Sequence, residues 1–428
     1  MSYDINAVRA QFPALAATDE GEPRIYLDNP AGTQVPSLVV ERMRHCLLEA
    51  NANLGGHFRT SRLAMDQVAD AHAAMADLLN AASADEIVFG QNMTTITLHL
   101  SRSLGRRFRA GDEIILTRMD HDANVAPWLL LARDLNLEVR WLPFDRSSFE
   151  FDTADLDGLL TDRTRLVCIG GASNLTGTIN DVRTISRKAR EAGAWTYVDA
   201  VQSVPHVATD VQALGCDFLV CSAYKFFGPH QGILWGRREV LEQLEPYKVR
   251  PAPGELPACF ETGTQSHEGM AGTAAAVDYL AWIGETMAGD CIERNRRYAP
   301  GRRRLVHAAL ELLFDYETGL ARRLIAGLGD LPGVKVQGIT DPQALARRVP
   351  TVSFTVDGTA PAGIAGALAA HNIFVWSGHN YAVEAARWLG IYEQGGAIRV
   401  GPVHYNTHGE IERLLAVLAD LLVRGREL

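Results

Sequence analysis

Two charged residues stand in apolar surroundings, where a charge needs a chemical reason. Lys225 lies in the segment Cys221–Gly228, which is apolar on both sides of the lysine. Burial there would lower the pKa of the amine from its usual value of about 10.4 and make it a better nucleophile for forming a Schiff base with a carbonyl compound. Asp199 ends the apolar run Trp195–Val198, where a carboxylate would be costly to bury alone. The ordinary alternatives are a solvated surface lysine and an aspartate that caps a helix.

Polar residues also gather in five loops, and each loop follows a predicted strand. The loops are Gly90–Thr95, Met119–Asn124, Gly170–Gly177, Asp199–Gln202 and Ser222–Lys225. One polar loop carries little information, because loops are polar in most proteins. Five of them at the carboxyl ends of one parallel sheet define a site, since ligands of open α/β sheets bind beyond those ends.

The elements that must position these loops follow from an alternation of apolar runs and amphipathic stretches after about residue 85. Short apolar runs predict strands at Glu86–Phe89, Glu113–Thr117, Glu138–Leu142, Arg165–Ile169, Trp195–Val198, Phe218–Cys221 and Gly232–Trp235. Stretches with helical spacing lie between most of them, at 93–104, 124–135, 155–161 and 181–192. The alternation predicts an α/β fold with a mostly parallel seven-stranded sheet covered on both faces.

A second, smaller α+β unit is expected after a boundary in the 280–300 region. A helical run at Arg302–Leu313 leads into strands at Gly333–Gln337, Thr351–Thr355, Ile373–Trp376 and Ile398–Val400, with helices near 361–370 and at Glu410–Arg424. A chain of 428 residues also exceeds what one compact core of ordinary size holds. We therefore predict a large domain over 20–290 and a small domain formed by 1–19 and 291–428.

Composition argues against several classes of function. The net charge is −10, with 51 acidic and 41 basic residues, which disfavours binding to nucleic acid or to anionic membranes. The sequence has no apolar stretch of the ~18 residues that a membrane span needs and no secretory signal pattern, so a cytoplasmic protein is expected. The six cysteines are scattered and the thirteen histidines show no HxH or HExxH pairing, so no metal site is expected.

Together these residues resemble the class V aminotransferase family, specifically its cysteine-desulfurase-like branch. The resemblance runs over nearly the whole chain and rests on an ordered set of motifs: Tyr26–Ala31, Val198–Gln202, Ser222–Lys225, Phe260–Thr264, Arg399 and Tyr405–Thr407. It implies the fold type I architecture of enzymes that depend on pyridoxal 5′-phosphate (PLP), with a large and a small domain. It also implies PLP as the cofactor.

The resemblance gives the loop residues roles around the cofactor ring. Lys225 would hold PLP as a Schiff base, and Asp199 would keep the pyridinium nitrogen protonated so that the ring serves as an electron sink. His121 would stack on the ring and move protons. Asn174 and Gln202 would hydrogen-bond the phenolic oxygen of the cofactor.

The cofactor phosphate would be held by hydroxyl groups. Thr94 and Thr95 stand at a predicted helix start, where backbone N–H groups favour an anion, and Ser222 would add a third hydroxyl. Thr264 resembles the threonine that the partner subunit contributes to this phosphate. The resemblance therefore implies a homodimer whose active site is shared between subunits.

Arg399 points to the class of substrate. It is an isolated charge in the apolar stretch Ala397–Val400, and in the family this arginine binds the α-carboxylate of the substrate as a bidentate fork. An arginine that snorkels or forms a structural salt bridge is the alternative. The resemblance therefore implies a small α-amino acid as substrate.

The loop Val375–Ala382 departs from the desulfurase pattern. Tyr381 stands in the position of the sulfur-accepting cysteine, and Trp376 stands in the position of an arginine. A phenol cannot accept sulfur to form a persulfide. Cys259, just before the Thr264 segment, is the nearest alternative candidate for this thiol. The aromatic pair, together with His379, is expected to contact a substrate side chain that is larger or more apolar than that of cysteine.

These features lead to one main hypothesis and its alternatives. We expect a PLP enzyme that acts on an α-amino acid as a C–S or C–X lyase without a persulfide cysteine. An aminotransferase and an amino-acid racemase or epimerase of the same family remain open. A PLP-binding regulatory protein without turnover is the alternative from a different class, and the missing thiol is what motivates it.

Overall fold

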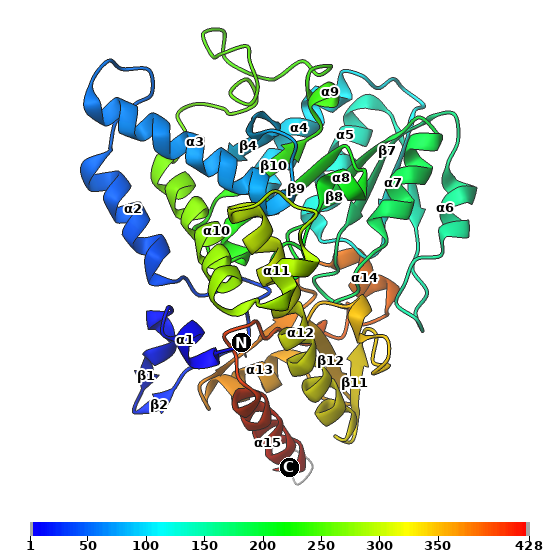
Figure 1. Ribbon diagram of the computed structural model, residues 1–428. Helices are drawn as coiled ribbons and strands as arrows, with labels where there is room; N and C mark the ends of the chain where they lie inside the picture. Colours follow the sequence, from blue (N-terminus) through cyan, green and yellow to red (C-terminus); the bar gives the residue numbers. More distant parts are fainter. Residues whose placement is uncertain (1–2, 425–428) are drawn as a thin grey trace.

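The larger lobe is built around a single seven-stranded sheet (Figure 1). In the computed structural model, which describes residues 3–424, its strands are β4 (Ile87–Gly90), β5 (Glu113–Thr117), β6 (Glu138–Leu142), β7 (Thr164–Gly170), β8 (Trp195–Asp199), β9 (Phe218–Ser222) and β10 (Gly232–Gly236). Their order in space is β4-β10-β9-β8-β7-β5-β6; β10 is antiparallel to both neighbours and the other pairs are parallel. The predicted mostly parallel sheet is confirmed, and each strand lies within one residue of its expected ends.

Helices cover both faces of this sheet. One face packs against α3 (Arg59–Leu79), α6 (Thr153–Leu159), α7 (Val182–Glu191) and α10 (His267–Met287), and the other against α4 (Met93–Gly105) and α5 (Ala126–Leu135). Because side chains alternate along a strand, Ile115 of β5 lies in the first core, whereas Ile114 and Leu116 lie in the second. With both faces buried, the loops at the carboxyl edge are the part of the sheet that is open to a ligand.

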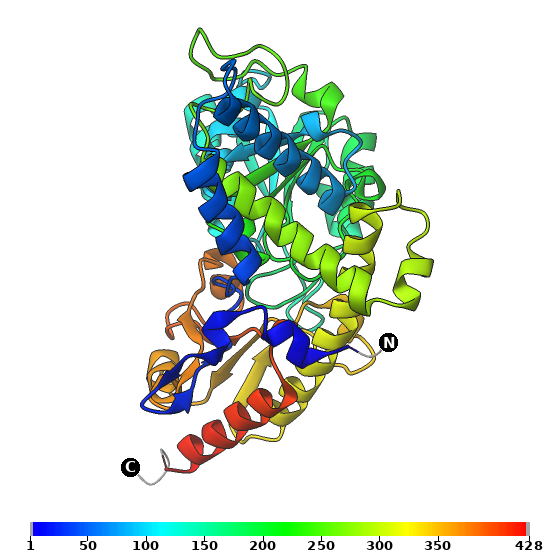
Figure 2. The ribbon, with the colours of Figure 1, turned by 60° about the vertical axis from the view of Figure 1, so that its left-hand side comes forward.

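The smaller lobe contains a four-stranded antiparallel sheet. In spatial order its strands are β11 (Val334–Gln337), β12 (Val352–Val356), β15 (Ala397–Val400) and β14 (Trp376–Gly378). This sheet packs against α13 (Pro361–Ala369), α15 (His408–Arg424) and the second half of α12 (Arg302–Gly329). Figure 2 shows α12 running from the larger lobe into the smaller one, so the two lobes share a continuous helix. The lobe matches the predicted smaller α+β unit.

Two elements of the smaller lobe differ from the prediction. The expected strand Ile373–Trp376 is two strands, because β13 (Ile373–Phe374) pairs with β3 (Ile25–Tyr26) and β14 pairs with β15. The helix expected at Arg302–Leu313 continues to Gly329. The pairing of β3 also places Ile25 in the core of the smaller lobe. The division of the chain at residues 19 and 290 stays a prediction.

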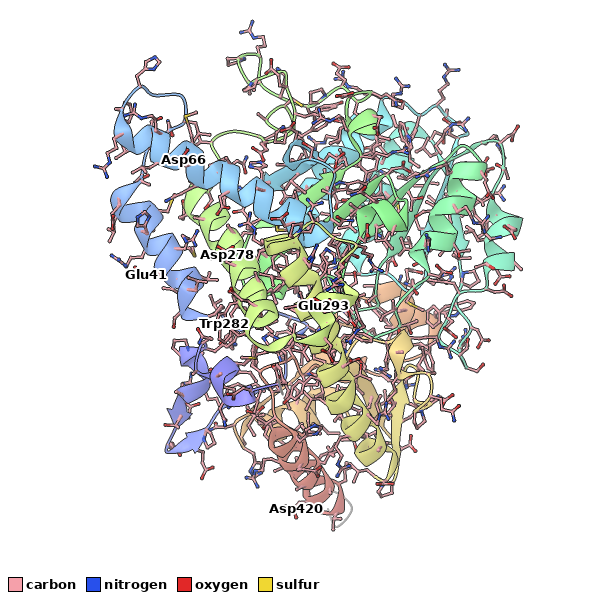
Figure 3. All side chains as sticks on the ribbon, in the orientation of Figure 1. Glu41, Asp66, Asp278, Trp282, Glu293 and Asp420 are labelled. Atoms are coloured by element: carbon pink, nitrogen blue, oxygen red, sulfur yellow. The ribbon has the colours of Figure 1, made fainter. Side chains whose placement is uncertain are left out.

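Three long helices of the larger lobe were not expected from the sequence pattern: α2 (Ser37–Glu49), α3 and α10. Helix α10 is rich in alanine and glycine and is buried around most of its circumference, so it lacks the polar stripe that marks an amphipathic helix. Its Asp278, labelled in Figure 3, lies 3.2 Å from Arg42 of α2 and 3.1 Å from Arg302 of α12. These ion pairs join the middle of α10 to α2 and to the first turn of α12.

The remaining elements are short. They are α1 (Ile5–Arg9), α8 (Val211–Leu214), α9 (Arg238–Leu241), α11 (Asp290–Arg294), α14 (Val383–Trp388), β1 (Thr18–Asp19) and β2 (Glu22–Pro23). Within residues 3–424, none of the helices is both long and apolar enough to cross a membrane. The same residues contain no group of three or more His, Cys, Asp or Glu side chains suited to holding a metal ion.

The buried position of Val167 in β7 predicts a loss of stability on truncation. Val167→Ala should lower the free energy of unfolding by about 1.5–3 kcal/mol, because it removes buried methyl groups and leaves a cavity between sheet and helices. Val423→Ala, at a site where the side chain is 61% exposed, should change it by less than about 0.5 kcal/mol. Denaturant titration of both variants measures the difference, and equal effects would contradict the assigned core.

Candidate functional site

A cavity of about 490 Å³ lies where the carboxyl edge of the large sheet meets the smaller lobe. Most of the predicted site residues line it: Thr94, His121, Asn174, Asp199, Gln202, Ser222, Lys225, Trp376, Tyr381 and Arg399. They come from segments spread over some three hundred residues of the chain. The topology brings them together because β5, β7, β8 and β9 are parallel and end at the same edge.

Lys225 ends the short turn after β9 and carries its amine into the cavity wall. Its Nζ donates hydrogen bonds to the carbonyl oxygens of Pro30 and Ala31, the second at 2.9 Å. Burial and, to a smaller extent, the nearby Arg399 guanidinium lower the pKa of the amine to about 7, against the opposite effect of the Asp28 and Asp199 carboxylates. The neutral amine that results near neutral pH is the form that attacks carbonyl carbons and accepts protons.

Asp199 is the last residue of β8 and is 6% exposed. Its carboxylate accepts a hydrogen bond from the backbone N–H of Val201 at 3.0 Å. Burial raises the pKa of Asp199 to about 6, and the Lys225 ammonium acts in the opposite direction. A buried carboxylate with one backbone partner can still pair with a cationic ring nitrogen, which suits the role predicted for it.

His121 carries a neutral ring beside the same cavity. Burial, followed by the charges of Lys225 and Arg399, lowers the pKa of His121 to about 3. Its Nδ1 accepts a hydrogen bond from the Ala123 N–H at 3.0 Å, which assigns the proton to Nε2. The Tyr381 ring stacks on it with the centroids 5.5 Å apart and the planes 15° apart.

The start of helix α4 forms the anion-binding end of the cavity. Asn92 is the N-cap and accepts a hydrogen bond from the Thr95 N–H, so the cap is not Thr94. Thr94 and Ser222 both line the cavity, and Ser222 Oγ accepts a hydrogen bond from the Met93 N–H. Hydroxyl groups at a helix start, where the helix dipole is positive, are suited to a phosphate.

Asn174 and Gln202 are buried and engaged with backbone carbonyls. Asn174 Nδ2 donates to the Asn380 carbonyl at 2.6 Å, and Gln202 Nε2 donates to the Pro30 carbonyl at 2.8 Å. Gln202 and Lys225 thus share Pro30 as an acceptor. The segment around Pro30 therefore lies directly against the lysine.

Arg399 is a second cation that lines the cavity. It is 4% exposed, and its Nη2 lies 3.5 Å from Asp28 Oδ1, while Nη1 donates to the Asn174 carbonyl at 3.3 Å. Its Nε has no hydrogen-bond partner among residues 3–424. A buried guanidinium with a free donor is poised to bind an anionic group.

The loop that carries Tyr381 is attached to the large lobe on both sides. Its Asn380 carbonyl accepts the Asn174 amide, and the Tyr381 carbonyl accepts the Asp122 N–H at 2.7 Å. Just beyond the loop, Glu384 pairs with Arg118 at 2.7 Å. The loop is therefore a fixed wall of the cavity.

Three predicted residues do not line this cavity: Thr95, Thr264 and His379. Thr95 and Thr264 line a neighbouring cavity of about 500 Å³, and Gln91 and His230 line both cavities. His379 belongs to the Tyr381 loop itself: its Nδ1 accepts a hydrogen bond from the Tyr381 N–H, and its ring stacks on Tyr392.

The sequence reading missed Asp120, which lines the cavity and is 3% exposed. Its Oδ1 accepts hydrogen bonds from the Thr117 hydroxyl and the Gly170 N–H, both at 2.8 Å, and its Oδ2 accepts from Asn124 at 2.7 Å. Burial raises the pKa of Asp120 to about 7. The only available signal was its place beside His121. Asn380 and His230 also line the cavity and were not predicted, because each stands in a polar loop where its residue type is ordinary.

These side chains fit PLP. Lys225 would hold the aldehyde carbon, Asp199 the pyridine nitrogen, His121 the ring face, and Thr94 and Ser222 the phosphate. Each group has the charge state or hydrogen-bonding capacity that its part of the cofactor requires.

The lowered pKa of Lys225 predicts how covalent attachment of PLP depends on pH. For protein freed of cofactor, the attachment rate should rise between about pH 6 and pH 8 and then level off, because the neutral amine already predominates above about 7. Borohydride reduction followed by peptide mapping measures the rate and the site. Lys335, on the surface, serves as the control peptide and should carry little label. A rate still climbing near pH 10 would contradict the burial argument.

The bonds of Asp120 predict that it holds the His121 loop against β7. Asp120→Ala should cost about 2–4 kcal/mol of stability, because it leaves the buried Gly170 N–H and the Asn124 amide without acceptors. PLP affinity should fall by about tenfold as the His121 loop loosens. Asp122→Ala in the same loop is the control, with little change expected in either quantity. Thermal unfolding and PLP titration provide the two readouts, and unchanged PLP affinity would contradict the positioning role.

Comparison with known proteins gives a consistent result across the chain. The family "Aminotransferase class-V" matches residues 25–301 and 306–414. A cysteine desulfurase of Yersinia pseudotuberculosis is 31% identical over 433 aligned positions, covering 98% of each chain. Among solved structures, the apo cysteine desulfurase of Thermococcus onnurineus is 29% identical with a TM-score of 0.86, covering 99% of this chain and all of that one. The cysteine desulfurase CsdA of Escherichia coli is 26% identical with a TM-score of 0.83, covering 99% of each.

Members of this family depend on PLP, and its cofactor is the one that the cavity side chains fit. The fold type I architecture expected from the sequence is confirmed by the structural neighbours. The chain therefore belongs to the class V aminotransferase family and is a PLP-dependent enzyme.

Proposed function

We propose that this enzyme acts on an α-amino acid as a C–S or C–X lyase that releases its products without forming a persulfide on the protein. The proposal rests on the chemistry of the cavity residues and on one substitution in its wall. The relatives are named for cysteine desulfuration, and the proposal gives this chain the amino-acid chemistry of that group without its sulfur carrier.

Two residues that line the cavity suit two groups of an amino acid, the α-carboxylate and the Cα–H. Arg399 would bind the α-carboxylate through its free Nε and its Nη groups, at the cost of competing with Asp28. Lys225 would accept the Cα proton at Nζ, since its lowered pKa keeps part of the amine neutral. PLP, when bound, supplies an electron sink that stabilises negative charge at Cα.

The reaction proposed is a β-elimination. The Cα–H proton passes to the Lys225 amine, and the Cβ–X bond breaks with its electron pair leaving on X. Addition of water then releases the keto acid and ammonia. With cysteine as substrate and one water consumed, the products balance as pyruvate, ammonia and hydrogen sulfide.

The observation that carries the proposal is the absence of a thiol at the cavity. Tyr381 stands in the position of the sulfur-accepting cysteine, in a loop fixed to the large lobe. All six cysteines are buried, and none lines the cavity. Cys259, the alternative candidate for the sulfur-accepting thiol, is 5% exposed, and burial raises the pKa of its thiol.

The mouth of the cavity favours a larger side chain than that of cysteine. Trp376 is 52% exposed and Tyr381 is 65% exposed, and both line the cavity. Large aromatic side chains left this open to solvent are suited to packing against an apolar part of a ligand. His379 supports this wall by accepting the Tyr381 N–H.

The enzyme is proposed to act as a homodimer without nucleic-acid or membrane partners. We infer a homodimer in which Thr264 of one subunit serves the phosphate site of the other, because Thr264 lies outside its own subunit's cofactor cavity. The acidic net charge of −10 supports the absence of nucleic-acid and membrane partners and is in keeping with a cytoplasmic enzyme.

Product analysis tests the proposed reaction. The holoenzyme is incubated with cysteine, β-chloroalanine and larger β-substituted amino acids, and pyruvate or its homologue is measured with ammonia and the leaving group. We expect keto acid and ammonia in equal amounts, with higher kcat/KM for the larger substrates. Lys225→Ala is the control and should be inactive, because it lacks the amine that accepts the Cα proton.

Other products would select the alternatives. Formation of alanine together with protein-bound sulfur would indicate a cysteine desulfurase. An inverted Cα centre would indicate a racemase or epimerase. Amino transfer that requires a keto acid would indicate an aminotransferase. No turnover of any amino acid, with PLP bound, would favour the regulatory protein.

A further inference from the structure

Asn380 is a buried polar side chain in the cavity wall that the proposed reaction does not use. It is 5% exposed and lines the cavity beside Trp376 and Tyr381. Its backbone has φ = 52°, in the left-handed region, which asparagine tolerates better than most residues. The loop therefore places this one side chain in a fixed position.

The hydrogen bonds of Asn380 determine which end of its amide is free. Nδ2 donates to the Gly378 carbonyl at 3.0 Å, so the nitrogen is identified by its acceptor. Oδ1 is buried and has no hydrogen-bond partner among residues 3–424. A buried acceptor without a donor costs free energy unless a ligand supplies the donor.

Asn380 also lies next to the group that would hold the substrate. Its carbonyl accepts the Asn174 amide at 2.6 Å, and the Asn174 carbonyl accepts Arg399 Nη1 at 3.3 Å. One residue thus separates Asn380 from the proposed carboxylate fork. Asn380 and Arg399 line the same cavity, so an amino acid held by Arg399 would share its space with this wall.

We propose that Asn380 is a specificity-determining residue whose Oδ1 accepts a hydrogen bond from an N–H or O–H donor on the substrate side chain. The inference rests on the proposed function, because it takes Arg399 as the carboxylate site. It narrows the substrate class to amino acids that combine an apolar portion, packed on Trp376 and Tyr381, with a hydrogen-bond donor. A purely hydrocarbon side chain would leave the Asn380 oxygen buried and unpaired.

Matched pairs of amino acids test this selectivity in the holoenzyme. The pairs are tyrosine with phenylalanine, threonine with valine, and glutamine with methionine, which differ mainly in the donor. Binding is measured as the change in cofactor absorption on titration, so turnover is not needed. The wild type should bind the donor-bearing member of at least one pair about 5- to 100-fold more tightly.

Variants of Asn380 separate recognition from loop structure. Asn380→Gly keeps the left-handed backbone but removes the amide, and should abolish the preference within the pair. Asn380→Asp keeps an acceptor and should retain it. Asn136→Gly is the control, because Asn136 has φ = 56° at the end of α5, outside the cavity. It should leave all affinities unchanged.

Three outcomes would overturn the inference. They are equal binding within every pair by the wild type, a preference that survives Asn380→Gly, and an equal loss for both members of a pair, which would assign the oxygen to the substrate amine. In each case amino acids still perturb the cofactor band, so the proposed function stands. If no amino acid perturbs the band in any variant, the proposed function fails with it.

Discussion

Burial of charge at the carboxyl edge of the parallel sheet is the constraint on which the site depends. Lys225, Arg399 and two aspartates face one cavity, and each would be costly to bury alone. Burial and the like charge of Arg399 lower the pKa of Lys225, whereas the carboxylates of Asp28 and Asp199 raise it and so offset part of this cost. The compensation is incomplete, and an amine that titrates near 7 is the result. The reactivity of the lysine is therefore a property of the whole edge.

The parallel strands and the residues at their ends could be predicted from the sequence because both depend on local patterns. Apolar runs such as Glu113–Thr117 mark buried strands, and the polar residues that follow them reach the carboxyl edge by topology alone. Helix α10 could not be predicted in this way, since a helix buried on most sides has no amphipathic period. β13 and β14 were read as one strand because a change of pairing partner leaves no mark in the composition.

Within the site, the predictable residues are those whose chemical type is unusual for their place. A lysine and an arginine in apolar stretches attract notice, whereas Asp120 and Asn380 sit in polar loops where such residues are ordinary. Their significance comes from partners distant in the sequence, such as Gly170 for Asp120 and Asn174 for the Asn380 loop. Long-range hydrogen bonds of this kind are set by tertiary structure. The same holds for Thr95 and His379, whose positions relative to the cavity depend on the exact course of a helix start and a turn.

The fixed loop around Tyr381 bears on the proposed chemistry as much as the proposed absence of a sulfur-accepting thiol does. A residue that carries sulfur away from a cofactor must approach the reacting atoms and then move away from them. Here Asn380 and Tyr381 both have left-handed backbones, and both of their carbonyls accept hydrogen bonds from the large lobe. Moving the loop would break these bonds and expose the stacked face of His121. A fixed wall of this kind is suited to shaping a substrate pocket. The presence of Tyr381 in the position of the cysteine and the rigidity of its loop therefore both favour the proposed β-elimination.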